Sequence, residues 1–200
     1  MRPEWEGIQI YHKDPTYGGR ARIVTLHNLI VDLIGAGILP DNFRFLEVGV
    51  FQGDVAEHLL ASFPFMSYTG IDAWKTQDEE VYKDTANSAD VLRKAKDLSY
   101  NRTNRFRGRC KFVEGFSPQI LDTMPDGYFH MAYIDANHSK DAVRADIIAV
   151  MTKLIPHGVI TGHDYCPGWE TVIEGVNSAA SLFGMSVESF WPESSVWMFV

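Results

Sequence analysis

The sequence predicts an α/β fold: a Rossmann-like, doubly wound and mostly parallel sheet of seven strands, with helices on both faces and an antiparallel C-terminal hairpin. Three observations support this prediction. Short apolar runs alternate with segments of helical periodicity, as in βαβ units. The first run is apolar almost throughout, which is typical of a strand buried on both faces of a parallel sheet. The alternation ends where two short runs flank Trp191-Pro192-Glu193-Ser194.

The N-terminal half is predicted to be a helix followed by two strand–helix units. Apolar side chains recur at spacings of three and four over residues 23–33, and a glycine ends this helix. Residues 43–50 form the first strand. Residues 55–63 repeat the helical pattern up to a proline, and residues 67–71 form the second strand. The polar stretch 75–109 is predicted to be helix plus loop.

The C-terminal half continues the alternation and then closes it with the hairpin. In chain order we expect a strand at 111–113, a short helix at 120–121, a strand at 129–134, a helix at 143–154, a strand at 158–161, a helix at 172–183 and a hairpin of 185–190 and 195–200. The last helix ends at Gly184, a favoured helix C-terminal residue. The hairpin predicts one antiparallel strand near the sheet edge.

The bulk composition fits one domain and excludes several classes of protein. The 200 residues are 46% hydrophobic, which is enough for a sizeable core. No linker divides the chain, so we expect one domain over 1–200, with an N-terminal segment and helix in 1–42 and the Rossmann-like core in 43–200. A net charge of -8 disfavours a nucleic-acid partner, which needs cations to neutralise phosphates. The basic residues between Arg102 and Lys111 are expected to be a solvated helix end and strand edge.

The location and assembly are expected from what the sequence contains. Cys110 and Cys166 form no C-x-x-C pair and are expected to be free thiols in a reducing compartment. No apolar run is long enough for a membrane span, and the N-terminus lacks an apolar signal core. We therefore expect a cytoplasmic protein without a membrane partner. A homodimer and a monomer are both left open.

Polar residues follow the predicted strands at the point where each strand ends. They are Glu47, Asp72, Asp135, His163 and Asp164. Because ligands of open parallel sheets bind at the carboxyl ends of the strands, this placement predicts one shared site.

The loop after the first strand favours a cationic ligand over a phosphate. Gly49 and Gly53 allow a sharp turn and a close approach of a ligand. Phe51 replaces the middle glycine of the dinucleotide fingerprint and would crowd a pyrophosphate. Glu47 would repel phosphate and attract an ammonium or sulfonium group, such as those of S-adenosylmethionine. The alternative is a tight turn with an exposed glutamate.

The next two strand ends carry residues suited to a nucleoside. Asp72 is placed to accept hydrogen bonds from ribose hydroxyls, and otherwise starts a helix. Trp74 would cover the ribose or adenine, or belong to the core. Phe116 would pack on the adenine ring, and Ser117 would bond its edge or cap a helix.

The fourth and fifth strand ends bring together two acids and two histidines. Asp135 and Asp164 would converge if their strands are neighbours, and paired carboxylates bind Mg²⁺. His138 or His163 as a further ligand would favour Mn²⁺ or Zn²⁺. A histidine here would alternatively act as general base. The remaining alternative is a pair of helix caps and a core histidine.

The motifs that carry these residues resemble a known superfamily. The segment 47–53 resembles the first motif of class I S-adenosylmethionine-dependent methyltransferases, in the form found in the cation-dependent O-methyltransferases. The segments 133–139 and 158–165 resemble the macrocin-type sugar O-methyltransferases and the cephalosporin-hydroxylase-like proteins. The chain departs from the catechol-type enzymes at Asp164-Tyr165, where they carry Asp-Asn. Their catalytic lysine has no secure match, and Lys140 is a weak candidate.

The resemblance implies a role for each of these positions. The expected cofactor-binding residues are Glu47, Gly49, Phe51, Gly53, Asp72, Trp74, Phe116, Ser117 and Asp135. The expected metal ligands are Asp135, Asp164 and His163, and the expected catalytic residues are His163, Asp135 and His138. The implied cofactors are S-adenosylmethionine and, as an open question, Mg²⁺ or another divalent metal.

The expected reaction is transfer of a methyl group to a small-molecule acceptor, at a hydroxyl oxygen. The alternatives are a nicotinamide-dependent oxidoreductase and a non-catalytic subunit that keeps the fold. Residues 1–19 and 75–109 are expected to shape the acceptor pocket through aromatic side chains. These are Tyr11, His12, Tyr17, Trp74, Tyr82 and Tyr100.

Overall fold

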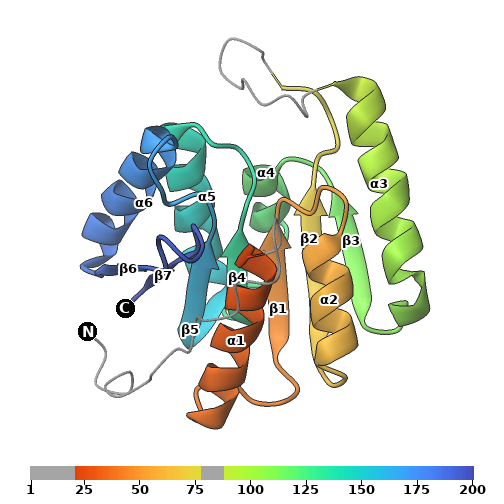
Figure 1. Ribbon diagram of the computed structural model, residues 1–200, viewed down its shortest axis with the longest axis horizontal. Coiled ribbons are helices and arrows are strands. Elements are labelled where there is room, and N and C mark those ends of the chain that lie inside the picture. The colour runs from red at the N-terminus through yellow and green to blue at the C-terminus, as the bar shows by residue number, and fades with distance from the viewer. Residues whose placement is uncertain (1–20, 78–87) are drawn as a thin grey trace.

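The seven-stranded α/β fold predicted from the sequence is confirmed by the computed structural model, which describes residues 21–77 and 88–200 (Figure 1). The strands are β1 Arg44–Val48, β2 Ser67–Asp72, β3 Cys110–Glu114, β4 Phe129–Ile134, β5 Leu154–Gly162, β6 Val187–Ser189 and β7 Trp197–Phe199. The helices are α1 Ala21–Gly35, α2 Asp54–Ser62, α3 Ala89–Thr103, α4 Ser117–Asp122, α5 Lys140–Lys153 and α6 Glu170–Phe183, with a 3-10 turn at Asn104–Phe106.

The strands lie in the order β3-β2-β1-β4-β5-β7-β6. β1 to β5 are parallel, whereas β7 pairs antiparallel with both β5 and β6. The one antiparallel strand expected near the edge is therefore β7. The chain leaves β1 toward β2 and β3 on one side and returns to β4 and β5 on the other. Such a reversal opens a crevice at the carboxyl ends of the strands.

Helices cover both faces because neighbouring residues of a strand point to opposite sides. Phe45 packs with α1 and α2 in one buried cluster, whereas Leu46 packs with α5 and α6 in the other. Both side chains are fully buried. Each face thus receives its own apolar layer, as a doubly wound sheet requires.

Two sequence-based expectations need correction. The helix expected over 143–154 ends at Lys153, and β5 begins at Leu154 rather than at residue 158. Pro156 accounts for the change, because a proline disfavours the helical conformation of the residue before it. The basic residues are also not simply solvated. Arg102 pairs with Asp54, and Arg109 donates to main-chain carbonyls around the end of α2.

No helix in residues 21–77 and 88–200 combines the length and apolarity that crossing a bilayer requires.

Candidate functional site

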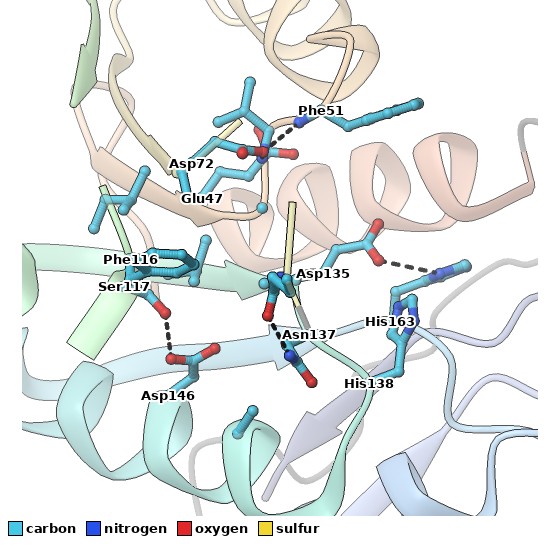
Figure 2. A pocket seen from close by; sticks show the side chains of 18 of the residues that line it. Glu47, Phe51, Asp72, Phe116, Ser117, Asp135, Asn137, His138, Asp146 and His163 are labelled. Atoms are coloured by element: carbon cyan, nitrogen blue, oxygen red, sulfur yellow. Dashed lines mark hydrogen bonds and ion pairs between the residues drawn. The ribbon is translucent and has the colours of Figure 1, made fainter. Parts of the chain in front are cut away.

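A cavity of about 460 Å³ lies over the carboxyl ends of the five parallel strands (Figure 2). Its size is typical of a small-molecule or cofactor site. Figure 2 shows Phe116 and Ser117 on one side of this cavity and Asp135, His138 and His163 on the other, with Asp72 and Glu47 along its wall. Most of the residues expected from the sequence are thus brought together.

Gly49 lets the loop after β1 approach β4 closely. Its φ is 94°, and a Cβ built there would lie 1.9 Å from the main-chain oxygen of Asp135. No other residue fits this position without moving the backbone. The cavity floor between β1 and β4 therefore depends on this glycine.

Gly53 has a different task from the one expected. It does not line the cavity but has a φ of 75°, and a Cβ there would lie 3.0 Å from the Cα of Ser99 in α3. The third glycine of a nucleotide-binding loop commonly permits such close packing. The structure thus gives Gly53 a packing role against α3, and its expected contact with the cofactor stays a prediction.

Asp72 fixes the shape of the loop. Its Oδ2 accepts hydrogen bonds from the main-chain N–H groups of Val50 (2.9 Å) and Phe51 (2.8 Å), and its Oδ1 accepts one from Trp74 (2.7 Å). Burial raises the pKa of Asp72, and these hydrogen bonds oppose the rise. The two N–H groups that could hold a phosphate are therefore occupied by a carboxylate. The remaining lone pair of Asp72 leaves room for a ribose hydroxyl.

Trp74 belongs to the core and not to the cavity wall. It is buried with Val50 and Ala95, and its indole N–H donates to the main-chain oxygen of Phe51 at 2.9 Å. Its burial favours the core alternative over the expectation that it covers the ribose or adenine. Tyr100 contacts the Trp74 ring and likewise does not line the cavity.

The other aromatic residues expected near the acceptor, Tyr11, His12, Tyr17 and Tyr82, lie outside the described residues.

Glu47 lies inside β1 and not at an exposed strand end. Its side chain is buried, yet its residue borders the cavity. The Tyr68 hydroxyl donates to its carboxyl group. Burial raises the pKa of Glu47 well above its ordinary value, against the lowering effect of the Tyr68 hydrogen bond. Burial therefore favours the protonated form of Glu47, whereas a nearby cation would favour the carboxylate.

The β3 end of the cavity combines an exposed ring with a buried acid. Phe116 is 45% exposed, and the Ser117 hydroxyl donates to Oδ1 of Asp146 on α5. Burial raises the pKa of Asp146 to about 6. The sequence analysis missed Asp146. Its signal was available, because this acid interrupts the apolar stripe of α5 between Val143 and Ile147.

The β4 and β5 ends carry a dense charge cluster. His163 Nδ1 lies 3.0 Å from Oδ1 of Asp164 and 3.7 Å from Oδ1 of Asp135. His138 Nε2 lies 3.0 Å from Oδ2 of Asp164. Burial would raise the pKa of Asp164, but hydrogen bonds from the two histidines hold it well below its ordinary value. The other ring nitrogen of His163, Nε2, is hydrogen-bonded to the Ser195 hydroxyl at 2.9 Å, which fixes the orientation of the ring.

His163 is a cation in this cluster. Burial lowers its pKa, but the hydrogen bonds and charges of Asp135 and Asp164 outweigh burial and raise it to about 9. A group that is protonated at neutral pH is poorly suited to accept a proton. This disfavours the general-base role expected for His163.

Three donor groups converge well enough for a cation. Among the described residues, ligand atoms of Asp135, His138 and Asp164 lie within 4.8 Å of one another. Two carboxylates and an imidazole suit a divalent transition metal such as Mn²⁺ better than an all-oxygen set would. The expected set contained His163 in place of His138. The structure favours His138, because His163 Nδ1 is engaged with the two carboxylates and its Nε2 with Ser195, and the metal ligands themselves stay a prediction.

Two cavity residues hold unusual backbone conformations. Phe51 has a φ of 47° and Asp164 a φ of 60°. Residues other than glycine seldom adopt a positive φ, and such conformations gather at functional sites. The loop after β1 and the loop after β5 are therefore both held in special shapes at the cavity.

Arg22 is the second residue that the sequence analysis missed. It lies in the first turn of α1 and lines the cavity, with its Nε 3.7 Å from Oδ2 of Asp135. No sequence signal marks it, since α1 precedes the first strand and lies outside the strand-end pattern. Lys140, the weak candidate for a catalytic lysine, pairs instead with Glu174 at 2.9 Å.

We expect His163→Gln to destabilise the protein in a pH-dependent way. A raised folded-state pKa adds stability that is fully present below the unfolded value near 6.5 and is lost as pH rises through about 9. The variant should therefore lose on the order of 3 kcal/mol at pH 6 and much less at pH 10, given about 1.4 kcal/mol per pKa unit. Urea unfolding at pH 6, 8 and 10 with a chelator measures this. An equal loss at all three values would contradict it.

Comparison with known proteins gives a family match and a set of similar folds. The family model described as a methyltransferase domain matches residues 46–165. The O-methyltransferase NovP is 14% identical, covers 90% of this chain and 78% of its own, and has a TM-score of 0.65. The calicheamicin methyltransferase CalS11 is 15% identical, covers 95% and 94%, and has a TM-score of 0.58. No curated protein sequence matches the chain.

A third similar structure carries a ligand. Fibrillarin from Aeropyrum pernix, with natively bound S-adenosyl-L-methionine, is 14% identical, covers 81% of this chain and 69% of its own, and has a TM-score of 0.55. At these identities the similarity concerns the fold alone. The matched range 46–165 contains the C-terminal part of β1 and all of β2 to β5, and so the carboxyl ends of all five parallel strands.

Proposed function

The chain belongs to the methyltransferase domain family and is a class I, S-adenosylmethionine-dependent methyltransferase, and from this premise we propose that it methylates a hydroxyl oxygen of a small acceptor. NovP is an O-methyltransferase, and CalS11 is also described as a TDP-rhamnose 3'-O-methyltransferase. Their fold similarity to this chain supports oxygen as the target atom.

One observation carries the proposal: Asp72 binds the N–H groups of Val50 and Phe51. In dinucleotide-binding folds a pyrophosphate sits on free N–H groups at this loop. A carboxylate in that place leaves a site for a phosphate-free ligand with positive charge. This argues for S-adenosylmethionine and against a nicotinamide dinucleotide.

We assign the cofactor an extended path across the strand ends. Adenine would lie between Phe116 and Ser117, with its amino group toward the carboxyl of Asp146. The ribose would meet Asp72, and the methionine part would cross Gly49 toward Asp135. Glu47 would face the sulfonium from below. Each assignment follows from the order β3-β2-β1-β4 of the strands that carry these residues.

The acceptor is then expected over β4 and β5. Methyl transfer is an in-line displacement at an activated sulfonium, so the protein mainly orients and desolvates the acceptor hydroxyl. Asp135, His138 and Asp164 would hold a divalent cation, which when bound lowers the pKa of a coordinated hydroxyl. The carboxylate of Asp135 would accept the proton, and His163, which lies near both acids, would balance their charge.

We expect the protein to bind S-adenosylmethionine, and Asp72→Ala to weaken that binding more than Asp135→Ala does. Asp72 supports the whole loop through three main-chain hydrogen bonds, whereas Asp135 contacts the outer end of the ligand path. Isothermal titration calorimetry with S-adenosylmethionine measures both, with circular dichroism to check folding and NADH as the control ligand.

Three outcomes of these experiments would contradict the proposed cofactor, the roles of the two aspartates or the catalytic activity. Absence of binding by the folded wild-type protein, or tight binding of NADH, would contradict the cofactor assignment. The opposite order of the two variants would contradict the roles given to the aspartates. Binding without turnover over a broad panel of hydroxyl acceptors, with Mg²⁺ and Mn²⁺ supplied, would favour a non-catalytic subunit.

A further inference from the structure

Arg22 lines the Asp135 end of the cavity and holds a buried side-chain nitrogen that makes no hydrogen bond with the described residues. Within residues 21–77 and 88–200 its buried Nε makes no hydrogen bond, and it meets Asp135 only at the longer distance of 3.7 Å. A buried donor that is left unsatisfied costs free energy unless a ligand or water completes it. Its position on the cavity wall makes a ligand the natural partner.

The strand order places Arg22 beside one particular part of the cofactor. The path proposed above runs from β3 through β2 and β1 to β4. Its last step lies where Gly49 touches the main chain of Asp135, and Arg22 pairs with the side chain of that same aspartate. The amino-acid part of S-adenosylmethionine ends there, and it carries one negative group, the carboxylate.

The charges around that point leave the carboxylate in need of a cation. Glu47, Asp54 and Asp135 border the same end of the cavity and suit the ammonium and sulfonium groups. The carboxylates of Asp54 and Asp135 would repel the carboxylate of the ligand. Among the described cavity-lining residues Arg22 and Lys75 are the arginine and lysine side chains, and Lys75 follows β2, at the ribose position.

Arg22 suits the task chemically. Burial lowers its pKa, and Asp135, Tyr133, Glu47 and Asp54 outweigh burial and raise it, so the guanidinium stays charged. A guanidinium offers parallel N–H donors that match the two oxygens of a carboxylate. Residue 22 also precedes the range 46–165 that the family model matches, so the match assigns it no role.

We propose that Arg22 binds the carboxylate of the methionine part of S-adenosylmethionine and so selects the intact cofactor over its decarboxylated form. This inference rests on the proposed function. It makes Arg22 a specificity-determining residue contributed by α1, the helix that comes before the Rossmann-like core.

The test compares the affinities of two ligands for two proteins, wild type and the Arg22→Met variant. S-adenosylmethionine and decarboxylated S-adenosylmethionine differ only in the carboxylate, and calorimetry gives the affinity of each for wild type and Arg22→Met. We expect Arg22→Met to weaken S-adenosylmethionine roughly 10- to 100-fold, the range for one charge-assisted contact. Decarboxylated S-adenosylmethionine should change less than about threefold, within the scatter expected when no contact is lost. Arg22→Lys should recover part of the loss.

Matched controls separate the outcomes. Lys75→Met removes the cavity-lining lysine and should leave the ratio of the two ligand affinities unchanged, and thermal unfolding verifies that each variant folds. An equal loss for both ligands, or no loss for either, would overturn the role of Arg22 while leaving cofactor binding intact. Wild-type protein that binds neither ligand would overturn the proposed function and this inference together.

Discussion

Replacement of Gly49 by alanine is expected to destabilise the protein by about 3 kcal/mol or more and to abolish measurable cofactor binding. A positive φ costs an L-residue about 1–2 kcal/mol, and overpacking adds about 1–3 kcal/mol. The added Cβ would lie 1.9 Å from the Asp135 main-chain oxygen and 2.5 Å from its carbonyl carbon, so two strand ends must separate. Urea unfolding and calorimetry with S-adenosylmethionine measure the two effects.

Gly37→Ala is the matched control for this prediction. Gly37 also has a positive φ, of 74°, but an added Cβ there meets nothing within 4 Å. It should therefore cost only the backbone penalty of about 1 kcal/mol and leave cofactor binding unchanged. Equal losses for the two variants would show that the close approach of β1 and β4 is not what makes Gly49 necessary.

Asp146→Asn is expected to stabilise the protein at neutral pH. Burial raises the folded-state pKa of Asp146 from 3.8 to about 6, so ionisation opposes folding once pH exceeds the unfolded value. The penalty starts near pH 4, is complete above about pH 6, and is on the order of 3 kcal/mol at about 1.4 kcal/mol per unit. Asparagine does not ionise and can still accept the hydrogen bond from Ser117.

The measurement is the free energy of unfolding of wild type and Asp146→Asn between about pH 3.5 and pH 8, taken at intervals of about one pH unit. This range covers the unfolded and folded pKa values of Asp146. The gain should vanish at the acid end and reach a plateau above about pH 6. Asp141→Asn, at an exposed site in the first turn of the same helix, should instead lose a few tenths of a kcal/mol. A gain that is independent of pH would refute burial as the cause.

The position of Asp146 on the cavity wall suggests why the protein keeps an acid that destabilises its fold. Proteins tolerate such groups mainly where function needs them. Asp146 borders the position assigned to adenine, where a carboxyl oxygen would accept a hydrogen bond from the amino group. The predicted stability gain and the proposed adenine contact therefore concern the same side chain.

Local sequence patterns were enough to predict the sheet and most of the residues around the cavity. Strand ends can be recognised from apolar runs, and parallel strands bring their ends to one edge. Asp72, Asp135, His163 and Asp164 were located in this way, because each follows an apolar run directly. Trp74 and Gly53 also lie shortly after a predicted strand. In the structure, however, Trp74 is buried in the core and Gly53 packs against α3.

The sequence by itself determined the strand–helix order, the antiparallel hairpin at the end and the acids that edge the cavity, since these depend on periodicity and near neighbours. Only the tertiary structure decided which groups meet. Arg22 joins Asp135, Ser117 joins Asp146, and His138 rather than His163 completes the group that can hold a cation. These pairs lie far apart in the chain. Packing of α1 and α5 against the sheet brings them together. Burial raises the pKa of Glu47 and Asp146, whereas the neighbouring Asp135 and Asp164 raise the pKa of His163 against the effect of burial.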